Sequence, residues 1–168
     1  MRLRKLKISD AESMLEWMHD KELCKYMHTN FSSKTLEDCL QFIEASSISS
    51  NSVHFAIVDD KDNYMGTVSL KNIQYGEDVA EFGIVVRRCA MGKGYSKFGM
   101  REIIKYGFDE LRLKKIVWCV SKFNVRANRF YIKNNYSLVT EFIPVSIREK
   151  YAKVDNLIWY GISQNEIS

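Results

Sequence analysis

The chain has 168 residues, 46% of them hydrophobic, which fits one globular domain that buries roughly 70% of its unfolded surface. Its 25 basic and 21 acidic residues leave a net charge of +4, which suits a phosphorylated ligand but is too small for a dedicated nucleic-acid binder. No stretch approaches about 18 apolar residues and the N-terminal residues lack the apolar core of a signal peptide, so we expect a soluble cytoplasmic protein without a membrane partner.

Alternating apolar and basic residues predict an opening strand over residues 2–8. Residues 9–12 have the pattern of a capping box, with Ser9 as the cap of a first helix. Ser33 is the predicted cap of a second helix, and the polar residues 46–52 are predicted to form a loop.

Two β-rich runs, 53–58 and 64–70, flank a polar turn and predict a hairpin, and residues 79–86 predict the next strand. Apolar residues at helical spacing between Met100 and Leu111 predict an amphipathic helix that packs on a sheet.

The last third of the chain reads as a buried strand over 116–120, a helix over 124–134, and final strands over 136–143 and 153–162. The resulting order, β-α-α-β-β-β-α-β-α-β-β, predicts an α/β fold with a mixed sheet, an antiparallel front and a βαβ centre.

The segment Met91-Gly92-Lys93-Gly94-Tyr95-Ser96 places two closely spaced glycines at the start of the amphipathic helix. Backbone N–H groups in a first helical turn lack helical acceptors, the helix dipole adds positive charge, and glycine removes the Cβ atom that would keep an anion away. The segment is therefore a candidate phosphate site.

Two common phosphate motifs do not fit this segment. A Walker loop needs Ser or Thr after Gly-Lys, but Gly94 follows Lys93. A dinucleotide fingerprint needs a third glycine where Lys97 stands, and an acidic residue where Lys114 and Lys115 stand.

The segment resembles instead the Arg/Gln-x-x-Gly-x-Gly/Ala loop that binds the coenzyme A pyrophosphate in the GNAT family of N-acetyltransferases. Met91 stands where Arg or Gln is usual, and Ser96 where Gly or Ala is usual. The resemblance implies that residues 91–96 contact acetyl-CoA, with Lys93 acting through its backbone N–H. The cations Arg87, Arg88, Lys93 and Lys97 would attract phosphates or form a solvated rim.

Residues 124–136 resemble a second motif of the family, Asn-x-x-Ala/Ser-x-x-x-Tyr-x-Lys-x-Gly-Phe, and the two motifs occur in the expected order. Asn135 replaces the usual glycine, and asparagine is the next best residue for a left-handed helix end. The resemblance extends over essentially the whole chain and implies a single N-acetyltransferase domain over 1–168.

The second motif suggests roles for three residues on one helix face. The resemblance implies that Tyr131 is the general acid that protonates the leaving thiolate, and that Asn124 and Ala127 contact the cofactor. The alternatives are that Tyr131 is a core aromatic and that Asn124 is only an N-cap.

Glu81 lies in an otherwise apolar strand, where a carboxylate calls for an explanation. The resemblance implies a general base, acting directly or through water. The alternative is a cross-strand salt bridge on a solvated sheet face, and the sequence leaves both open.

The resemblance also implies direct transfer from acetyl-CoA to an amine, with strand residues Ile84, Val85 and Val86 holding the pantetheine arm. Cys89 and Cys119 have no histidine nearby in sequence and are expected to be structural. The cysteines and histidines have no metal-ligand spacing, so no metal site is expected.

The acceptor segments of the family correspond to residues 17–31 and 144–151. Aromatic residues mixed with histidine suit a sugar, base or peptide more than a polyamine, which would need an acidic cleft. The chain resembles the branch that acetylates ribosomal proteins, spermidine and nucleotide-linked amino sugars. We therefore expect a small-molecule amine, with an amino sugar first and a protein N-terminus second, for a monomer or homodimer. A non-catalytic acyl-CoA-binding domain is the third alternative.

Overall fold

The computed structural model describes residues 1–139 and 143–166. Within them, seven strands form one mixed sheet in the order β1-β2-β3-β4-β5-β7-β6. The strands are β1 (Arg2–Lys5), β2 (Val53–Val58), β3 (Tyr64–Gln74), β4 (Val79–Val86), β5 (Lys115–Ser121), β6 (Ser137–Leu138) and β7 (Leu157–Ser163). The helices are α1 (Ala11–Met18), α2 (Lys21–Cys24), α3 (Leu36–Ile48), α4 (Tyr95–Asp109), α5 (Val125–Lys133) and α6 (Val145–Glu149).

The mixed α/β architecture predicted from the sequence is confirmed. Strands β1 and β2 pair antiparallel, whereas β4 and β5 pair parallel with α4 between them in sequence, which is the expected βαβ centre. In the described part of the chain, no helix is both long and apolar enough to cross a bilayer.

The chain divides into two compact units, so that β3, β4 and α4 contribute residues to both. The first unit comprises residues 1–69 and 83–103, and the second comprises residues 70–82 and 104–168. Each unit has its own packing and is described by itself.

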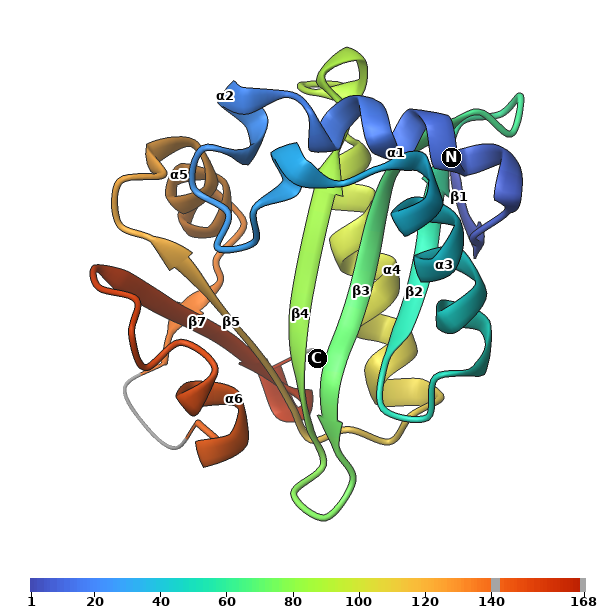
Figure 1. Cartoon of the computed structure of the whole chain (residues 1–168). Helices are drawn as coiled ribbons and strands as arrows, with labels where there is room; N and C mark the ends of the chain where they lie inside the picture. The colour runs from blue at the N-terminus through green and yellow to red at the C-terminus, as the bar shows by residue number, and fades with distance from the viewer. Residues whose placement is uncertain (140–142, 167–168) are drawn as a thin grey trace. The chain divides into compact units, whose positions relative to one another are not determined.

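In the first unit, helices α1 and α3 cover one face of the strands, and the first half of α4 lies behind them (Figure 1). Met14 and Trp17 of α1 and Cys39 of α3 pack with Ala56 of β2 in one buried cluster. Successive strand residues point to opposite faces, so neighbouring Ile57 faces Gly99 of α4. The helix and strand periodicities thus build a three-layered unit.

In the second unit, β5 lies between β4 and β7, and its side chains alternate between two faces. Trp118 packs with Tyr160 of β7 and with Tyr131 of α5 on one face. Val117 packs with Ile147 of α6 on the other face.

Two predicted helix caps are wrong. Helix α3 is capped by Thr35, not Ser33: Thr35 Oγ1 accepts from the Asp38 N–H at 3.2 Å, and the Asp38 carboxylate accepts from the Thr35 N–H at 2.8 Å. Ser9 lies inside a 3-10 turn before α1, in which the Asp10 carboxylate accepts from the Lys7 N–H at 2.8 Å and from Arg4 at 2.7 and 2.8 Å.

Several predicted boundaries also differ. Helix α3 continues to Ile48, into the segment predicted to be a loop, and β3 continues beyond residue 70. Of the predicted strand 136–143, β6 keeps two residues, and residues 140–142 lie outside the described part. The last strand begins at Leu157 rather than 153, after a helix that the sequence did not predict.

Substitution of Gly66 tests the close approach of β3 to β4 in the first unit. A Cβ atom on Gly66 would overlap the Val85 carbonyl oxygen and lie 3.0 Å from Val86 Cα, whereas one on Gly76 would meet nothing within 4 Å. We expect Gly66→Ala to lower the free energy of unfolding by about 1–3 kcal/mol and Gly76→Ala to change it by less than about 1 kcal/mol. Urea unfolding measures both, and equal midpoints would contradict the packing.

Candidate active site

The glycine segment adopts the backbone conformation that requires glycine. Gly92 has φ +75° and Gly94 has φ +88°, both in the left-handed region that side chains disfavour. A Cβ atom at Gly92 would meet no described atom within 4 Å, and one at Gly94 would meet only the end of the Met1 side chain at 3.8 Å. The glycines therefore serve the turn itself and leave open space beside it.

The start of α4 has unused donors. Among the described residues, no acceptor binds the backbone N–H groups of Gly92, Gly94, Tyr95, Ser96 and Lys97. The Lys93 N–H, which we expected to contact the ligand, instead donates a long 3.4 Å hydrogen bond to the Ala90 carbonyl. These free groups at the N-terminus of a helix form a site suited to an anion.

The arginines before this segment are paired with carboxylates. Arg87 Nη2 lies 2.5 Å from Glu16 of α1, and its Nη1 donates to the Tyr64 carbonyl at 3.0 Å. Arg88 binds Asp20 through Nε at 2.7 Å and Nη2 at 2.5 Å. Their side chains are thus engaged by α1 and by the residue before α2.

Asp20 has two functions in this contact. Its Oδ1 also accepts from the Leu23 N–H at 3.1 Å and so caps α2. The hydrogen bonds from Arg88 and from the Leu23 backbone hold the pKa of Asp20 below its ordinary value. Arg88 therefore ties the glycine segment to the start of α2 within the first unit.

The predicted cofactor strand lies in the same unit. Val85 packs against the cluster formed by α1 and α3, and Val86 is buried. The Ile84 side chain points to the other face, toward Gly99 of α4.

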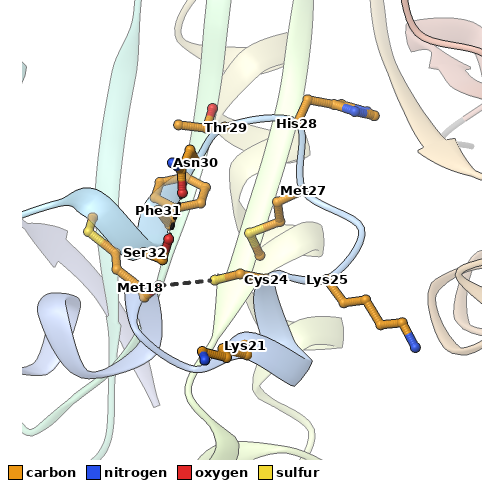
Figure 2. Close-up of a pocket in the computed structure, with 10 residues that line it drawn as sticks. All are labelled: Met18, Lys21, Cys24, Lys25, Met27, His28, Thr29, Asn30, Phe31 and Ser32. Carbon is orange, nitrogen blue, oxygen red and sulfur yellow. Dashed lines mark hydrogen bonds between the residues drawn. The ribbon is translucent and has the colours of Figure 1, made fainter.

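A pocket of about 380 Å³ lies beside α2 (Figure 2). Its wall runs from Met18 at the end of α1, through α2, to the segment ending at Ser32. Cys24 is one of its lining residues, and its thiol donates to the Trp17 carbonyl at 3.2 Å and to the Met18 carbonyl at 3.5 Å. The pocket therefore belongs entirely to the first predicted acceptor segment, residues 17–31, and its immediate continuation.

Tyr131 lies on α5 in the second unit and is 7% exposed. Its ring packs against Trp118 at 5.3 Å and Tyr160 at 5.0 Å between centroids. No described residue hydrogen-bonds its hydroxyl, and burial followed by the nearby Tyr160 and Tyr136 raises its pKa. The buried Trp118 Nε1 also has no partner among the described residues. The phenol is thus protonated at neutral pH and available to donate.

The helix that carries Tyr131 begins as expected. Asn124 is its N-cap, and its Oδ1 accepts from the Ala127 N–H at 3.1 Å. Asn135 has φ +60°, so the prediction of a left-handed helix end is confirmed.

Sequence reasoning missed Asn128, which is buried one turn before Tyr131. Its Oδ1 accepts from the Tyr160 hydroxyl at 2.8 Å, and its Nδ2 donates to the Ser121 carbonyl at 3.0 Å and the Asn124 carbonyl at 2.9 Å. Its position three residues before Tyr131, on the same helix face, was the available signal. Asn128 fixes α5 against β5 and β7.

Glu81 is 2% exposed and accepts from four side chains of the second unit. Lys71 and Lys150 Nζ each lie 3.2 Å away, Asn72 Nδ2 lies 2.5 Å away, and the Tyr151 hydroxyl donates to Oε1. Burial alone would raise the pKa of Glu81, but the Lys71 charge, the Tyr151 hydrogen bond and the Lys150 charge together hold it below its ordinary value. The ion pair with Lys71 is the cross-strand salt bridge that the second interpretation predicted. The prediction that it lies on a solvated face of the sheet is wrong, because the Glu81 carboxylate is buried.

Cys119 lies close to this cluster. Burial, followed by the Glu81 charge, raises the pKa of its thiol to about 12. A thiol that remains protonated at neutral pH is a poor nucleophile, which supports the structural interpretation of this residue. Among the described residues, no three His, Cys, Asp or Glu side chains are placed to hold a metal ion.

The family model for the acetyltransferase (GNAT) domain matches residues 1–137. An uncharacterized N-acetyltransferase p20 from Bacillus licheniformis is 32% identical over 117 residues, which cover 68% of this chain and 66% of that protein. Acetyltransferase PseH from Campylobacter jejuni is 25% identical over 81% of this chain and 82% of that protein.

The fold is shared with a solved structure. Spermidine N-acetyltransferase from Vibrio cholerae, in complex with CoA and spermine, superposes with a TM-score of 0.80 and 21% identity over 98% of this chain and 96% of that one. Together with the family match over most of the chain, these findings establish that the chain belongs to the GNAT family of N-acetyltransferases, which take their acetyl group from acetyl-CoA.

Proposed function

We propose that this protein transfers the acetyl group of acetyl-CoA to a primary amine of a small molecule, with an amino sugar as the first candidate. The observation that carries the proposal is Tyr131, whose ring is buried while its hydroxyl, protonated at neutral pH, has no hydrogen-bond partner among the described residues and is not one of their fully buried polar atoms. Such a group is suited to give its proton to a leaving thiolate.

The donor site in this proposal is the glycine segment. The free N–H groups at the start of α4 would bind the pyrophosphate of acetyl-CoA, with residues 91–96 around it. The strand residues Ile84, Val85 and Val86 would contact the pantetheine arm, as in the family pattern. Asn124 and Ala127 are the further cofactor contacts proposed from that pattern.

The reaction would proceed by direct attack. The neutral amine nitrogen forms a bond to the thioester carbon, the carbon–sulfur bond breaks, and the sulfur takes the proton of Tyr131. The attacking nitrogen, which is positively charged once its bond to carbon has formed, loses a proton to solvent water, and water returns a proton to the Tyr131 phenolate. Because no covalent enzyme intermediate is formed, neither Cys89 nor Cys119 is needed.

Of the two interpretations of Glu81, its surroundings favour the salt bridge over the general base, and we infer from its further contacts that it is a positioning residue. A base needs a free lone pair and a pKa near the working pH, whereas this carboxylate accepts from four donors and has a lowered pKa. Its contacts to Lys150 and Tyr151 would instead fix the second predicted acceptor segment, 144–151.

A Glu81 that does not act as a base agrees with an acceptor amine of low pKa. Neutralising a lysine-like amine at pH 7 requires about 4.6 kcal/mol, whereas an amine with a pKa near 8 requires about 1.4 kcal/mol. This difference favours an amino sugar. A protein N-terminus has a similarly low pKa and remains the second candidate.

Tyr131→Phe tests the general acid. We expect kcat to fall by about 100-fold while the Kd of acetyl-CoA stays unchanged, because only the proton donor is removed. Tyr136→Phe is the matched control, since it removes a hydroxyl from the same aromatic cluster. Free thiol release against a panel of amines measures turnover. Acetyl-CoA binding without thiol release from any amine would indicate a non-catalytic domain.

Gly94→Trp tests the donor site. An indole beside the free N–H groups would block the anion, and a side chain at φ +88° is strained, so we expect the affinity for acetyl-CoA to fall at least about tenfold. Gly76→Trp, in an exposed turn with open space around it, is the control. Unchanged affinity in the Gly94 variant would refute the loop assignment.

Glu81→Gln separates the two interpretations of Glu81. A lowered folded-state pKa means that the carboxylate stabilises the fold fully above about pH 4.3 and loses this effect as the pH falls through the folded-state value. We expect the free energy of unfolding of the variant to be lower by about 3 kcal/mol at pH 7. As the pH is lowered, it should fall less steeply than that of the unsubstituted protein. Glu77→Gln, at an exposed site, is the control.

For a positioning residue, the pH profile of kcat/KM should keep its shape in Glu81→Gln while KM for the amine rises. Loss of the acidic limb of that profile, with unchanged stability, would identify Glu81 as the base instead.

A further inference from the structure

We infer that copies of this chain associate by docking an acidic face of α3 on one copy against a basic face of α5 on another. The two faces have opposite charge, and each carries exposed apolar side chains. The association does not depend on the reaction proposed above. The acidic face comprises Glu37, Gln41, Glu44 and Ile48, and the basic face comprises Val125, Arg126, Arg129, Ile132 and Lys133.

The basic face lies on the outside of α5 in the second unit. The nine residues of this helix include Arg126, Arg129 and Lys133, all exposed, and no carboxylate. Val125 is 53% exposed and Ile132 is 65% exposed. At 3.6 residues per turn, the five side chains lie within about a third of the helix circumference, away from the aromatic cluster that α5 covers. One side of the helix is therefore both basic and apolar.

The charge of the basic face is not neutralised by its own part of the chain. Residues 111–139 contain no Asp or Glu, and no described carboxylate forms an ion pair with Arg129 or Lys133. Four of the ten exposed large apolar side chains in the described residues lie within 123–138. Single exposed apolar residues are ordinary, but such a concentration in one segment indicates an interaction surface.

The acidic face lies on the outside of α3 in the first unit. The thirteen residues of this helix include no Lys or Arg. Glu37, Gln41, Glu44 and Ile48 follow one another at helical spacing and are exposed, Ile48 by 82%. The Gln41 Nε2 donates to Glu37 at 3.1 Å, as expected for neighbours on one helix face. The buried Cys39 lies on the opposite side of the helix.

The two faces match in the spacing of their charges. Glu37 and Glu44 are two helical turns apart, as are Arg126 and Lys133, so each pair spans about 10 Å along its helix axis. Helices in contact lie about 8–10 Å apart, within reach of these long side chains. Ile48 can then pack beside the apolar residues of α5 while opposite charges flank the contact.

A second copy is the partner that these charges favour. An anionic membrane or a nucleic acid would match α5 but leave the exposed acidic and apolar residues of α3 without a role. One chain carries both complementary faces, so the contact joins different surfaces of the two copies. Such a contact can recruit a third copy wherever a face stays uncovered.

The association should be weak and sensitive to salt. The two helices have nine and thirteen residues, so the contact is small, and exposed ion pairs contribute little each. We expect a Kd of roughly 10 µM to 1 mM at low salt. Because salt screens exposed charges beyond about 8 Å at physiological strength, the Kd should rise as salt is added.

Charge reversal tests the contact. In sedimentation velocity of the full chain, we expect the average mass to rise with concentration between about 5 µM and 1 mM. Arg126→Glu with Arg129→Glu should raise the Kd at least about tenfold, and so should Glu37→Lys with Glu44→Lys, because like charges then face each other. All four substitutions in one chain should restore association, because the signs are again opposite.

A matched control is Lys105→Glu with Lys153→Glu, which makes the same charge change at two exposed lysines outside both faces. It should leave the Kd within about twofold. Urea unfolding shows whether each variant folds, and the single reversals Arg129→Glu and Glu44→Lys give the same comparison where a double variant does not.

Three results would overturn the inference. The chain could stay monomeric at the highest concentration, or reversal on either helix could leave the Kd unchanged. Added coenzyme A could abolish the association, which would assign the basic residues to the cofactor. Vesicles of phosphatidylglycerol that bind the monomeric chain, and lose it on Arg126→Glu with Arg129→Glu, would assign the basic face to an anionic surface instead.

Discussion

The ion pairs of Arg87 and Arg88 are the interactions on which the candidate site of the first unit depends. Both arginines precede the glycine segment, and they reach Glu16 of α1 and Asp20 at the start of α2. A four-residue helix such as α2 is too short to persist alone and needs an external anchor. The same two ion pairs hold the residues just before the glycine segment, which leads into the free N–H groups of α4. Helix α2, the glycine segment and the pocket are therefore connected within the first unit.

Glu81 and Tyr131, both in the second unit, differ in how their polar atoms are bonded. Glu81 is surrounded by donors from β3 and from the segment after α6, which makes it costly to move and poorly suited to exchange protons. The Tyr131 hydroxyl is held by no described residue. This hydroxyl is not one of the fully buried polar atoms of the described residues and contributes no hydrogen bond to their stability, which leaves it available to a ligand.

Sequence patterns predicted those features of the structure that depend on residues close together in the chain. Strands over 53–58 and 79–86 begin and end where alternation and turn residues placed them, and Asn135 takes the left-handed conformation expected after α5. The cap at Thr35 was missed because Ser33 had an equally suitable side chain, and only the 3-10 turn before it decides between them. The partners of Glu81 were missed because Lys150 and Tyr151 lie about seventy residues away in sequence, and no periodicity reports such a contact.

The pocket beside α2 is built from one uninterrupted stretch, residues 18–32. Its wall can therefore change by substitutions or short insertions in a single segment, while Tyr131 and the glycine loop lie elsewhere in the chain. Under the proposed function, recombination of that stretch between relatives would exchange acceptor preference as a module. A scaffold arranged in this way can diversify its substrates faster than its chemistry, because the two are inherited from separate parts of the sequence.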